Sequence, residues 1–115
     1  MQAAGARRDN RLTGRLAATP GWPALSHRFK IAPGKLVEAC GSLRLSSVVQ
    51  WHYQASGPLD FEIHYHEGKA VSFPMRQAGR ARADGTLNVA VSEPYCWMWK
   101  NTAPQPISVT IDLTR

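Results

Sequence analysis

Apolar and polar residues alternate along most of the chain after residue 26 with a period of two, which is the period of a half-buried β-strand. The clearest segment is 59–66, where Leu59, Phe61, Ile63 and Tyr65 alternate with Asp60, Glu62, His64 and His66. We therefore expect the four apolar side chains to lie in a core and the four polar side chains to lie on an outer face.

Other segments show the same alternation, or form short apolar runs bounded by turn residues. The predicted strands are 27–32, 36–40, 48–54, 59–66, 70–73, 85–91, 95–101 and 107–113. Residues 55–58 are expected to reverse the chain, and residues 75–84 to form a polar loop. Short strands without a long helical segment predict an all-β fold, an antiparallel β-sandwich of seven or eight strands.

Length and composition are consistent with one small folded domain. The chain has 115 residues, of which 43% are hydrophobic and 19% charged, so wholesale disorder is excluded. No run of apolar residues is long enough to predict a transmembrane helix. We assign residues 27–115 to the domain and residues 1–26 to a flexible basic leader, in which residues 12–18 are expected to form one or two helical turns.

The net charge of +6 is confined to the first 35 residues, which hold seven basic residues and one acidic residue. The rest of the chain is electrically balanced, so a solvated basic tail explains the charge better than nucleic-acid binding does. The same segment lacks the apolar run of a secretory signal peptide, so no signal is visible and the compartment stays open.

Histidines on the outer face suggest metal chemistry. His64 and His66 are two residues apart on one strand, the spacing with which strands present two imidazoles to zinc or copper. If residues 55–58 form a hairpin, His52 lies opposite Glu62, and His52, Glu62, His64 and His66 gather within reach of one ion, with Glu67 nearby. The other interpretation is that these polar side chains only hydrate the face.

Nothing in the sequence predicts an enzyme. The serines lie in turn contexts without a nucleophile-elbow motif, and no glycine-rich loop precedes a helix. Arg76, Arg80 and Arg82 lie in the predicted polar loop, where solubility explains them. We therefore expect no catalytic residue and no cofactor, apart from zinc or copper if the histidine face binds a metal.

The second part of the chain resembles the GOLD (Golgi dynamics) domain. Three stretches carry the resemblance: residues 48–53 with Trp51, residues 59–63 with Asp60, and the alternating Tyr95, Trp97, Trp99 and Asn101. The resemblance covers residues 36–113 and implies a free-standing β-sandwich that acts as a binding or adaptor module. Unlike the cargo receptors of that family, the sequence shows no membrane helix or coiled coil, so a role in vesicle traffic is not carried over.

The two cysteines of the chain are either joined by a disulfide or both reduced. Cargo-receptor GOLD domains hold one disulfide, and Cys40 lies where its first partner is expected, whereas the second position matches Met98 and Cys96 comes two residues earlier. The resemblance thus implies a Cys40–Cys96 bridge, which would indicate an exported or periplasmic protein. The alternative is two buried, reduced cysteines that pack as small apolar groups.

The sequence therefore predicts a non-enzymatic β-sandwich that binds a protein or an amphiphile at a sheet face or a loop edge. The second hypothesis is a small metal-binding protein that uses the histidine face.

Overall fold

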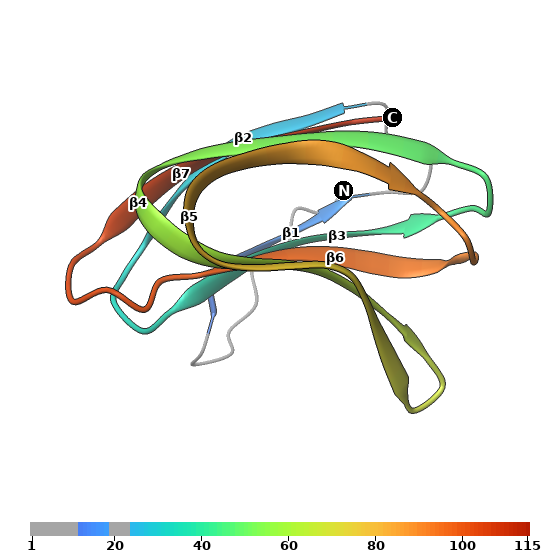
Figure 1. Ribbon diagram of the computed structural model, residues 1–115, viewed down its shortest axis with the longest axis horizontal. Helices are drawn as coiled ribbons and strands as arrows, with labels where there is room; N and C mark the ends of the chain where they lie inside the picture. Colours follow the sequence, from blue (N-terminus) through green and yellow to red (C-terminus); the bar gives the residue numbers. More distant parts are fainter. Residues whose placement is uncertain (1–11, 19–23) are drawn as a thin grey trace.

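The computed structural model describes residues 12–18 and 24–115, and these form strands and turns (Figure 1). The strands are β1 (Leu12–Ala18), β2 (Ala24–Ile31), β3 (Leu36–Leu43), β4 (Val48–Glu67), β5 (Ala70–Asn88), β6 (Glu93–Lys100) and β7 (Ile107–Thr114). Six of them, β2 to β7, lie in the continuous stretch 24–115. Within the described ranges, no helix has the length and apolar composition needed to span a bilayer.

β4 is shared by the two layers of the fold. Its first half, residues 50–55, pairs with β7, and its second half, residues 60–65, pairs with β6. One sheet with the order β1-β3-β6-β4-β7-β2 therefore curls until its two ends face each other (Figure 1). β5 pairs with β4 along the edge that is opposite β6 and β7. The all-β, largely antiparallel prediction is confirmed. The expected pair of separate sheets is instead one curled sheet, because β4 is too long to belong to a single layer.

The core fills the space between these layers, and the predicted alternation is confirmed. Phe61, from the second half of β4, contacts Trp51 and Tyr53 from its first half, with ring centroids 4.9 Å and 5.0 Å away. Trp99 of β6 stacks on Phe61 at 5.3 Å. Because the two halves of β4 face each other through these rings, the aromatic cluster holds the curl closed.

Residues 55–58 do not reverse the chain, which corrects the prediction of a hairpin there. β4 runs through them as a bulge, and its register with β5 shifts between Gln54 and Leu59. Gly57 and Pro58 carry turn chemistry, but here it bends a strand from one layer into the other. The predicted loop 75–84 is likewise strand, because β5 follows the same bend. Its Gly79 has a φ of 66° and donates its backbone N–H to Asp60 Oδ1 at 3.0 Å.

One strand, and the start of a second, lie in the range assigned to the leader. Residues 12–18, expected to be helical turns, form β1, which pairs in parallel with β3, and β2 begins at Ala24. Extended backbone is favoured because β3 offers an open edge on which β1 can complete hydrogen bonds. Residues 1–11 and 19–23 lie outside the described residues, and the division into leader and domain stays a prediction.

Asn101, the last residue of the predicted aromatic signature, is fully buried at the end of β6. Its side-chain amide donates to the carbonyl oxygens of Ile31 (2.9 Å) and Gln105 (2.8 Å), and its Oδ1 accepts from the N–H of Ala103 (2.8 Å). Asn101 thus ties the end of β2 to the connection between β6 and β7. Its role in this fold is structural, because every polar group of the side chain is used inside the protein.

Two core tyrosines keep their hydroxyl groups satisfied. Tyr53 donates to the Arg80 carbonyl oxygen at 3.1 Å, and burial raises its pKa to about 12. Tyr95 donates to the Val91 carbonyl oxygen at 2.9 Å, and burial likewise raises its pKa. Both side chains are therefore neutral hydrogen-bond donors of the interior at physiological pH.

Candidate functional site on the outer face around His64

Strand register sets the candidate site on the outer face of the layer that contains β3, β6 and the second half of β4. Cys40 pairs with Cys96, and Cys96 pairs with His64 on its other side. One row along, Glu38 pairs with Met98, Met98 with Glu62, and Glu62 with Arg76. Side chains in such rows lie next to one another. We call Glu38, Cys40, Glu62, His64, Arg76 and Cys96 the His64 cluster.

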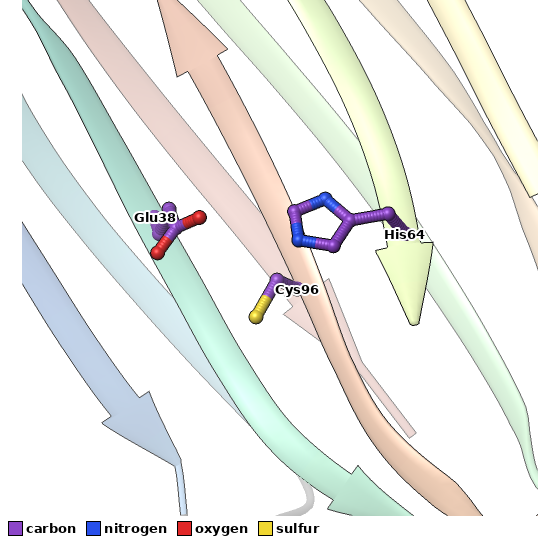
Figure 2. A group of neighbouring side chains, drawn as sticks. All are labelled: Glu38, His64 and Cys96. Carbon is purple, nitrogen blue, oxygen red and sulfur yellow. The ribbon is translucent and has the colours of Figure 1, made fainter. Parts of the chain in front are cut away.

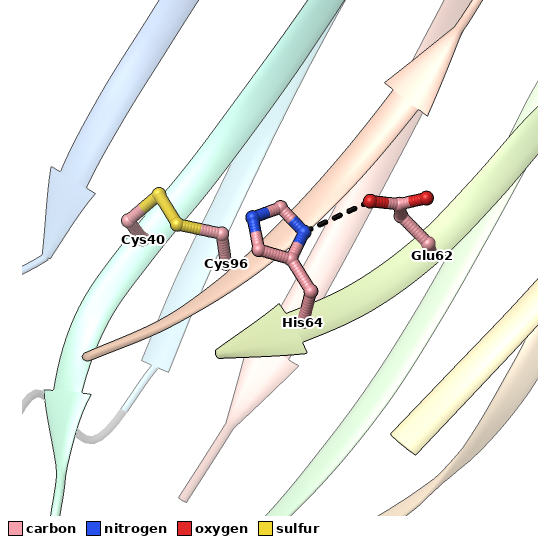
Figure 3. The surroundings of a disulfide bond; sticks show 4 residues. All are labelled: Cys40, Glu62, His64 and Cys96. Carbon is pink, nitrogen blue, oxygen red and sulfur yellow. Dashed lines mark ion pairs between the residues drawn. A yellow bond between two sulfur atoms is a disulfide. The ribbon is translucent and has the colours of Figure 1, made fainter. Parts of the chain in front are cut away.

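A disulfide joins Cys40 and Cys96 across β3 and β6, with the two Cα atoms 4.1 Å apart (Figure 3). The two residues are directly opposite in the register, and even-numbered positions of both strands face outward. The alternative of two reduced cysteines is thus decided in favour of the bridge. The bridge joins two residues that are 56 positions apart in the sequence, and it links β3 to β6.

His64 is buried although it belongs to the polar face, with only 9% of the residue exposed. Its Nδ1 lies 3.0 Å from Glu62 Oε2, and Nδ1 has no aligned hydrogen bond. The other ring nitrogen points toward the disulfide (Figure 3). The imidazole therefore lies between a carboxylate on one side and two sulfur atoms on the other.

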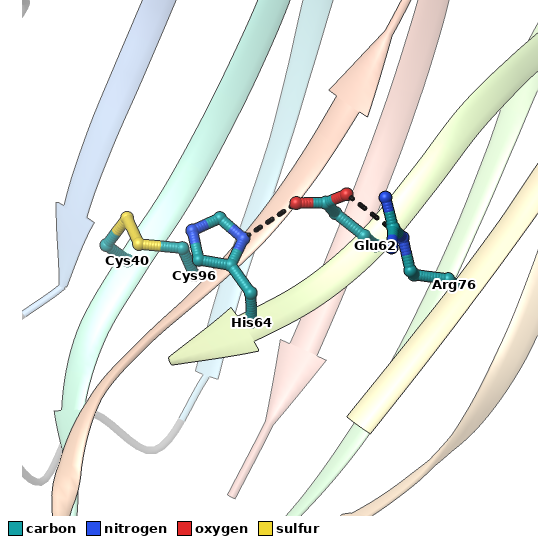
Figure 4. A network of polar contacts seen from close by, with 5 residues as sticks. All are labelled: Cys40, Glu62, His64, Arg76 and Cys96. Carbon is teal, nitrogen blue, oxygen red and sulfur yellow. Dashed lines mark ion pairs between the residues drawn. A yellow bond between two sulfur atoms is a disulfide. The ribbon is translucent and has the colours of Figure 1, made fainter. Parts of the chain in front are cut away.

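Glu62 connects His64 to Arg76. Its second carboxylate oxygen, Oε1, lies 3.8 Å from Arg76 Nε, so three charged or polarisable groups follow one another across the face (Figure 4). The guanidinium carbon of Arg76 lies 4.2 Å from the centroid of the Phe73 ring. Glu62 is thus contacted from two sides, by His64 and by the largely exposed Arg76.

The predicted metal-ligand set is only partly brought together. His64 and His66 have ring centroids 5.5 Å apart, and Glu62 contacts His64. His52 does not lie opposite Glu62, because β4 does not fold back on itself. It pairs with Asp84 and Asp112, and its Nδ1 lies 3.6 Å from Asp112 Oδ2. Metal binding by the predicted set stays a prediction. The hairpin that was expected to bring His52 to the other ligands does not form.

Glu38 is a residue of the cluster that the sequence did not indicate. One ligand atom each of Glu38, His64 and Cys96 can be chosen such that all three lie within 4.8 Å of one another (Figure 2). The three residues come from β3, β4 and β6, so only the register of these strands reveals their proximity. Only one signal was available in the sequence: Glu38 and Cys40 are two residues apart on one strand and therefore point to the same face.

A shallow hollow of about 490 Å³ adjoins the cluster on the same face. Its lining includes Asp60, Glu62, Arg76, Met98 and Lys100. The hollow combines an apolar thioether with charges of both signs, a surface suited to a mixed polar and apolar ligand.

Among the described residues, one further polar trio surrounds His52. Ser26 Oγ donates to Asp112 Oδ1 at 2.7 Å, and Asp112 Oδ2 faces His52. The carboxylate lies between the hydroxyl and the imidazole, so the imidazole does not contact the serine. The trio therefore lacks the serine–histidine contact of a catalytic triad.

Comparison with known proteins shows the fold class. No protein-family model and no curated protein matches the chain. Among solved structures, the pre-peptidase C-terminal domain of collagenase from Bacillus anthracis is similar, with 8% identity and a TM-score of 0.67 over 92% of this chain and 100% of that one.

Two periplasmic inhibitors of g-type lysozyme are also similar. PliG from Aeromonas hydrophila has 10% identity and a TM-score of 0.57 over 88% of this chain and 98% of that one. PliG from Salmonella Typhimurium has 12% identity and a TM-score of 0.56 over 89% and 98%. At these identities the likeness establishes a small all-β domain, and the GOLD resemblance is not specifically reproduced.

Proposed function

We propose that this chain is an exported, non-catalytic β-domain that binds a protein partner through the outer face of the β4–β5 hairpin. The disulfide supports export, because such bonds persist in oxidising compartments. The PliG neighbours are by their names periplasmic inhibitors of another protein, so this fold suits such a role. The observation that carries the proposal is the exposed aromatic–arginine pair on the hairpin.

The β4–β5 hairpin turns at Gly68 and projects from the two layers (olive in Figure 1). It exposes two large apolar side chains, Val71 at 43% and Phe73 at 41%. Arg76 lies over the Phe73 ring. Aromatic residues, methionine and arginine are enriched in protein interfaces, and arginine and aromatics dominate binding energy where a partner desolvates them.

The hollow beside the hairpin extends this surface. Met98 supplies an adaptable apolar contact, while Lys100 and Asp60 supply charges of opposite sign at its edge. An apolar centre with a polar rim is the usual arrangement of a protein-binding patch. We therefore place the centre of the partner on Phe73 and Arg76, with Met98 in contact.

The GOLD resemblance also supports a role as a binding or adaptor module. Its signature residues Tyr95, Trp97 and Trp99 are all buried, so they support the fold and leave the partner to exposed residues. The sequence also allowed an amphiphile as the ligand. A photo-reactive group on the surface distinguishes the two ligands, because it forms adducts with protein in one case and with lipid in the other.

To test the proposal, a photo-reactive phenylalanine analogue replaces Phe73 in the full chain expressed in its native host. We expect one or a few discrete protein adducts after illumination. The matched control places the same analogue at Leu45, a 59% exposed apolar residue outside the hairpin. Equal adducts at both positions, or no protein adduct at Phe73, would contradict the proposal, and adducts to lipid alone would favour the amphiphile.

Once the adduct identifies a partner, Phe73→Ala and Arg76→Ala should each lower its affinity at least about 10-fold, the effect of truncating an interface hot spot. Val48→Ala, at another exposed apolar position, should leave the affinity unchanged. If all three variants bind equally well, the hairpin is not the binding surface.

A further inference from the structure

Potential metal ligands of three chemical types meet beside the disulfide. Ligand atoms of Glu38, His64 and Cys96 lie within 4.8 Å of one another, and Cys40 is bonded to Cys96 (Figure 2). Donors of a tetrahedral zinc site lie about 2.0–2.3 Å from the ion. Rotations of the Glu38, His64 and Cys96 side chains would therefore bring these three ligand atoms to coordinating distance, and Cys40 would join them once its bond to Cys96 is broken.

His64 is already oriented as a metal ligand. Its Nδ1 faces Glu62 at 3.0 Å, which leaves the other ring nitrogen directed at the sulfur atoms (Figure 3). Metal-binding histidines commonly present one nitrogen to the ion while a carboxylate holds the other, and the carboxylate fixes the ring. Arg76 holds Glu62 in turn (Figure 4). His64 is also nine-tenths buried, and its 3.0 Å contact with Glu62 is close without being an aligned hydrogen bond.

The sulfur atoms become strong ligands only when the disulfide is reduced, because thiolates rather than disulfide sulfurs bind zinc. A dithiol reductant would supply two electrons and two protons, break the S–S bond, and itself become a disulfide. Zn²⁺ would then displace the two thiol protons to solvent. The two cysteines would stay side by side, since Cys40 and Cys96 are directly paired on adjacent strands.

We propose that reduction of the Cys40–Cys96 disulfide creates a zinc site in which Cys40, Cys96, His64 and Glu38 are the four ligands and Glu62 orients His64. In the oxidised protein the same positions hold β3 to β6 by a covalent bond. In the reduced protein the metal replaces that bond as a link and adds β4 to it. This site shares only Glu62 and His64 with the metal-ligand set expected from the sequence, and it belongs to the reduced chain, whereas the protein-binding proposal concerns the oxidised chain.

Cobalt(II) titration tests the ligand set. The full chain is reduced with a dithiol, freed of reductant without oxygen, and titrated with Co²⁺. We expect one equivalent to produce thiolate charge-transfer bands and the strong visible bands of a tetrahedral site, which added Zn²⁺ removes. The oxidised chain, titrated alongside, should produce neither.

Variants assign the ligands. His64→Ala should abolish the tetrahedral spectrum, and Glu62→Gln should weaken metal affinity by about 10- to 100-fold, as second-layer partners do. His52→Ala is the matched control, because His52 lies on the other half of β4 beside Asp112, and it should bind as the wild type does. If His64→Ala and His52→Ala give the same spectrum and affinity as the wild type, the proposed site is wrong.

Thermal unfolding covers the case in which reduction or a substitution loosens the fold. Zn²⁺ should raise the Tm of the reduced wild type, or refold it, because the ion binds only the assembled site. The oxidised chain and the reduced His64→Ala variant should show no such rise. A reduced wild type whose unfolding does not respond to Zn²⁺ would overturn the inference.

Discussion

The two halves of β4 carry similar outward histidines in different surroundings. His64, in the second half, is buried between Glu62 and a disulfide, whereas His52, in the first half, has 48% of its side chain exposed beside Asp112. Both follow the same alternation, and the difference comes from the neighbouring strands. The lesson is that strand period determines which way a side chain points, while register determines what it meets.

Removal of the disulfide beside His64 should lower the free energy of unfolding more than any other change proposed here. In Cys40→Ala/Cys96→Ala, with a chelator present, the free energy of unfolding should fall by about 2–5 kcal/mol, because the unfolded chain regains the freedom that the bridge removed. Guanidinium denaturation measures the loss. Dithiol-treated wild type should lose a similar amount, and an unchanged unfolding midpoint in the variant would mean that the bridge does not stabilise this layer.

The half of β4 near His52 depends instead on close packing. A Cβ at Gly85 would lie 2.6 Å from Trp51 Cζ2, so Gly85→Ala should cost about 1–3 kcal/mol of stability through the overlap with the ring. Gly57→Ala is the control: its Cβ would meet the flexible end of Ile107 at 3.2 Å, and its loss should be smaller. Equal losses in denaturant unfolding would contradict this account.

Substitution of the histidines themselves tests the comparison directly. His64→Ala in the oxidised protein should cost about 1.5 kcal/mol, because it removes a buried side chain and its contact with Glu62. His52→Ala should stay within about 0.5 kcal/mol, as for other exposed positions. Thermal or denaturant unfolding of both variants is the measurement, and similar losses would show that burial does not separate the two sites.

Tyr53 tests a single hydrogen bond at neutral pH and the ionisation of its hydroxyl in alkali. Tyr53→Phe should cost about 1 kcal/mol through the lost hydrogen bond to the Arg80 carbonyl oxygen. The folded-state pKa is raised from 10.0 to about 12, so wild-type stability from this group is complete below pH 10 and is lost as the pH rises toward 12. The variant should lose less stability over that range, and parallel pH profiles would exclude Tyr53 as a cause of the loss.

Local pattern predicted the inward-facing residues of each strand. Phe61, Ile63, Trp97 and Trp99 are buried as their alternation required, because parity depends only on neighbouring residues. Gly57 and Pro58 gave a correct signal for a change of direction but not its kind. The same residues suit a reversal and a bend, and only the pairing of β4 with both β6 and β7 distinguishes them.

Long-range register supplied the rest of the candidate site. Glu38 lies beside His64 although 26 positions of sequence separate them, because β6 lies between their strands and aligns both. Arg76 reaches Glu62 because the predicted polar loop is strand. Neither relation can be derived from composition or spacing, since each depends on which strands become neighbours.

The membership of β4 in both layers also bears on how the domain can be divided. A cut anywhere along residues 48–67 would take a central strand from one layer and leave an open edge in the other. Neither layer then has a complete set of backbone partners of its own. The domain accordingly behaves as an indivisible unit in protein engineering: grafting, splitting or permuting it is best attempted at the turns between strands, such as the one at Gly68.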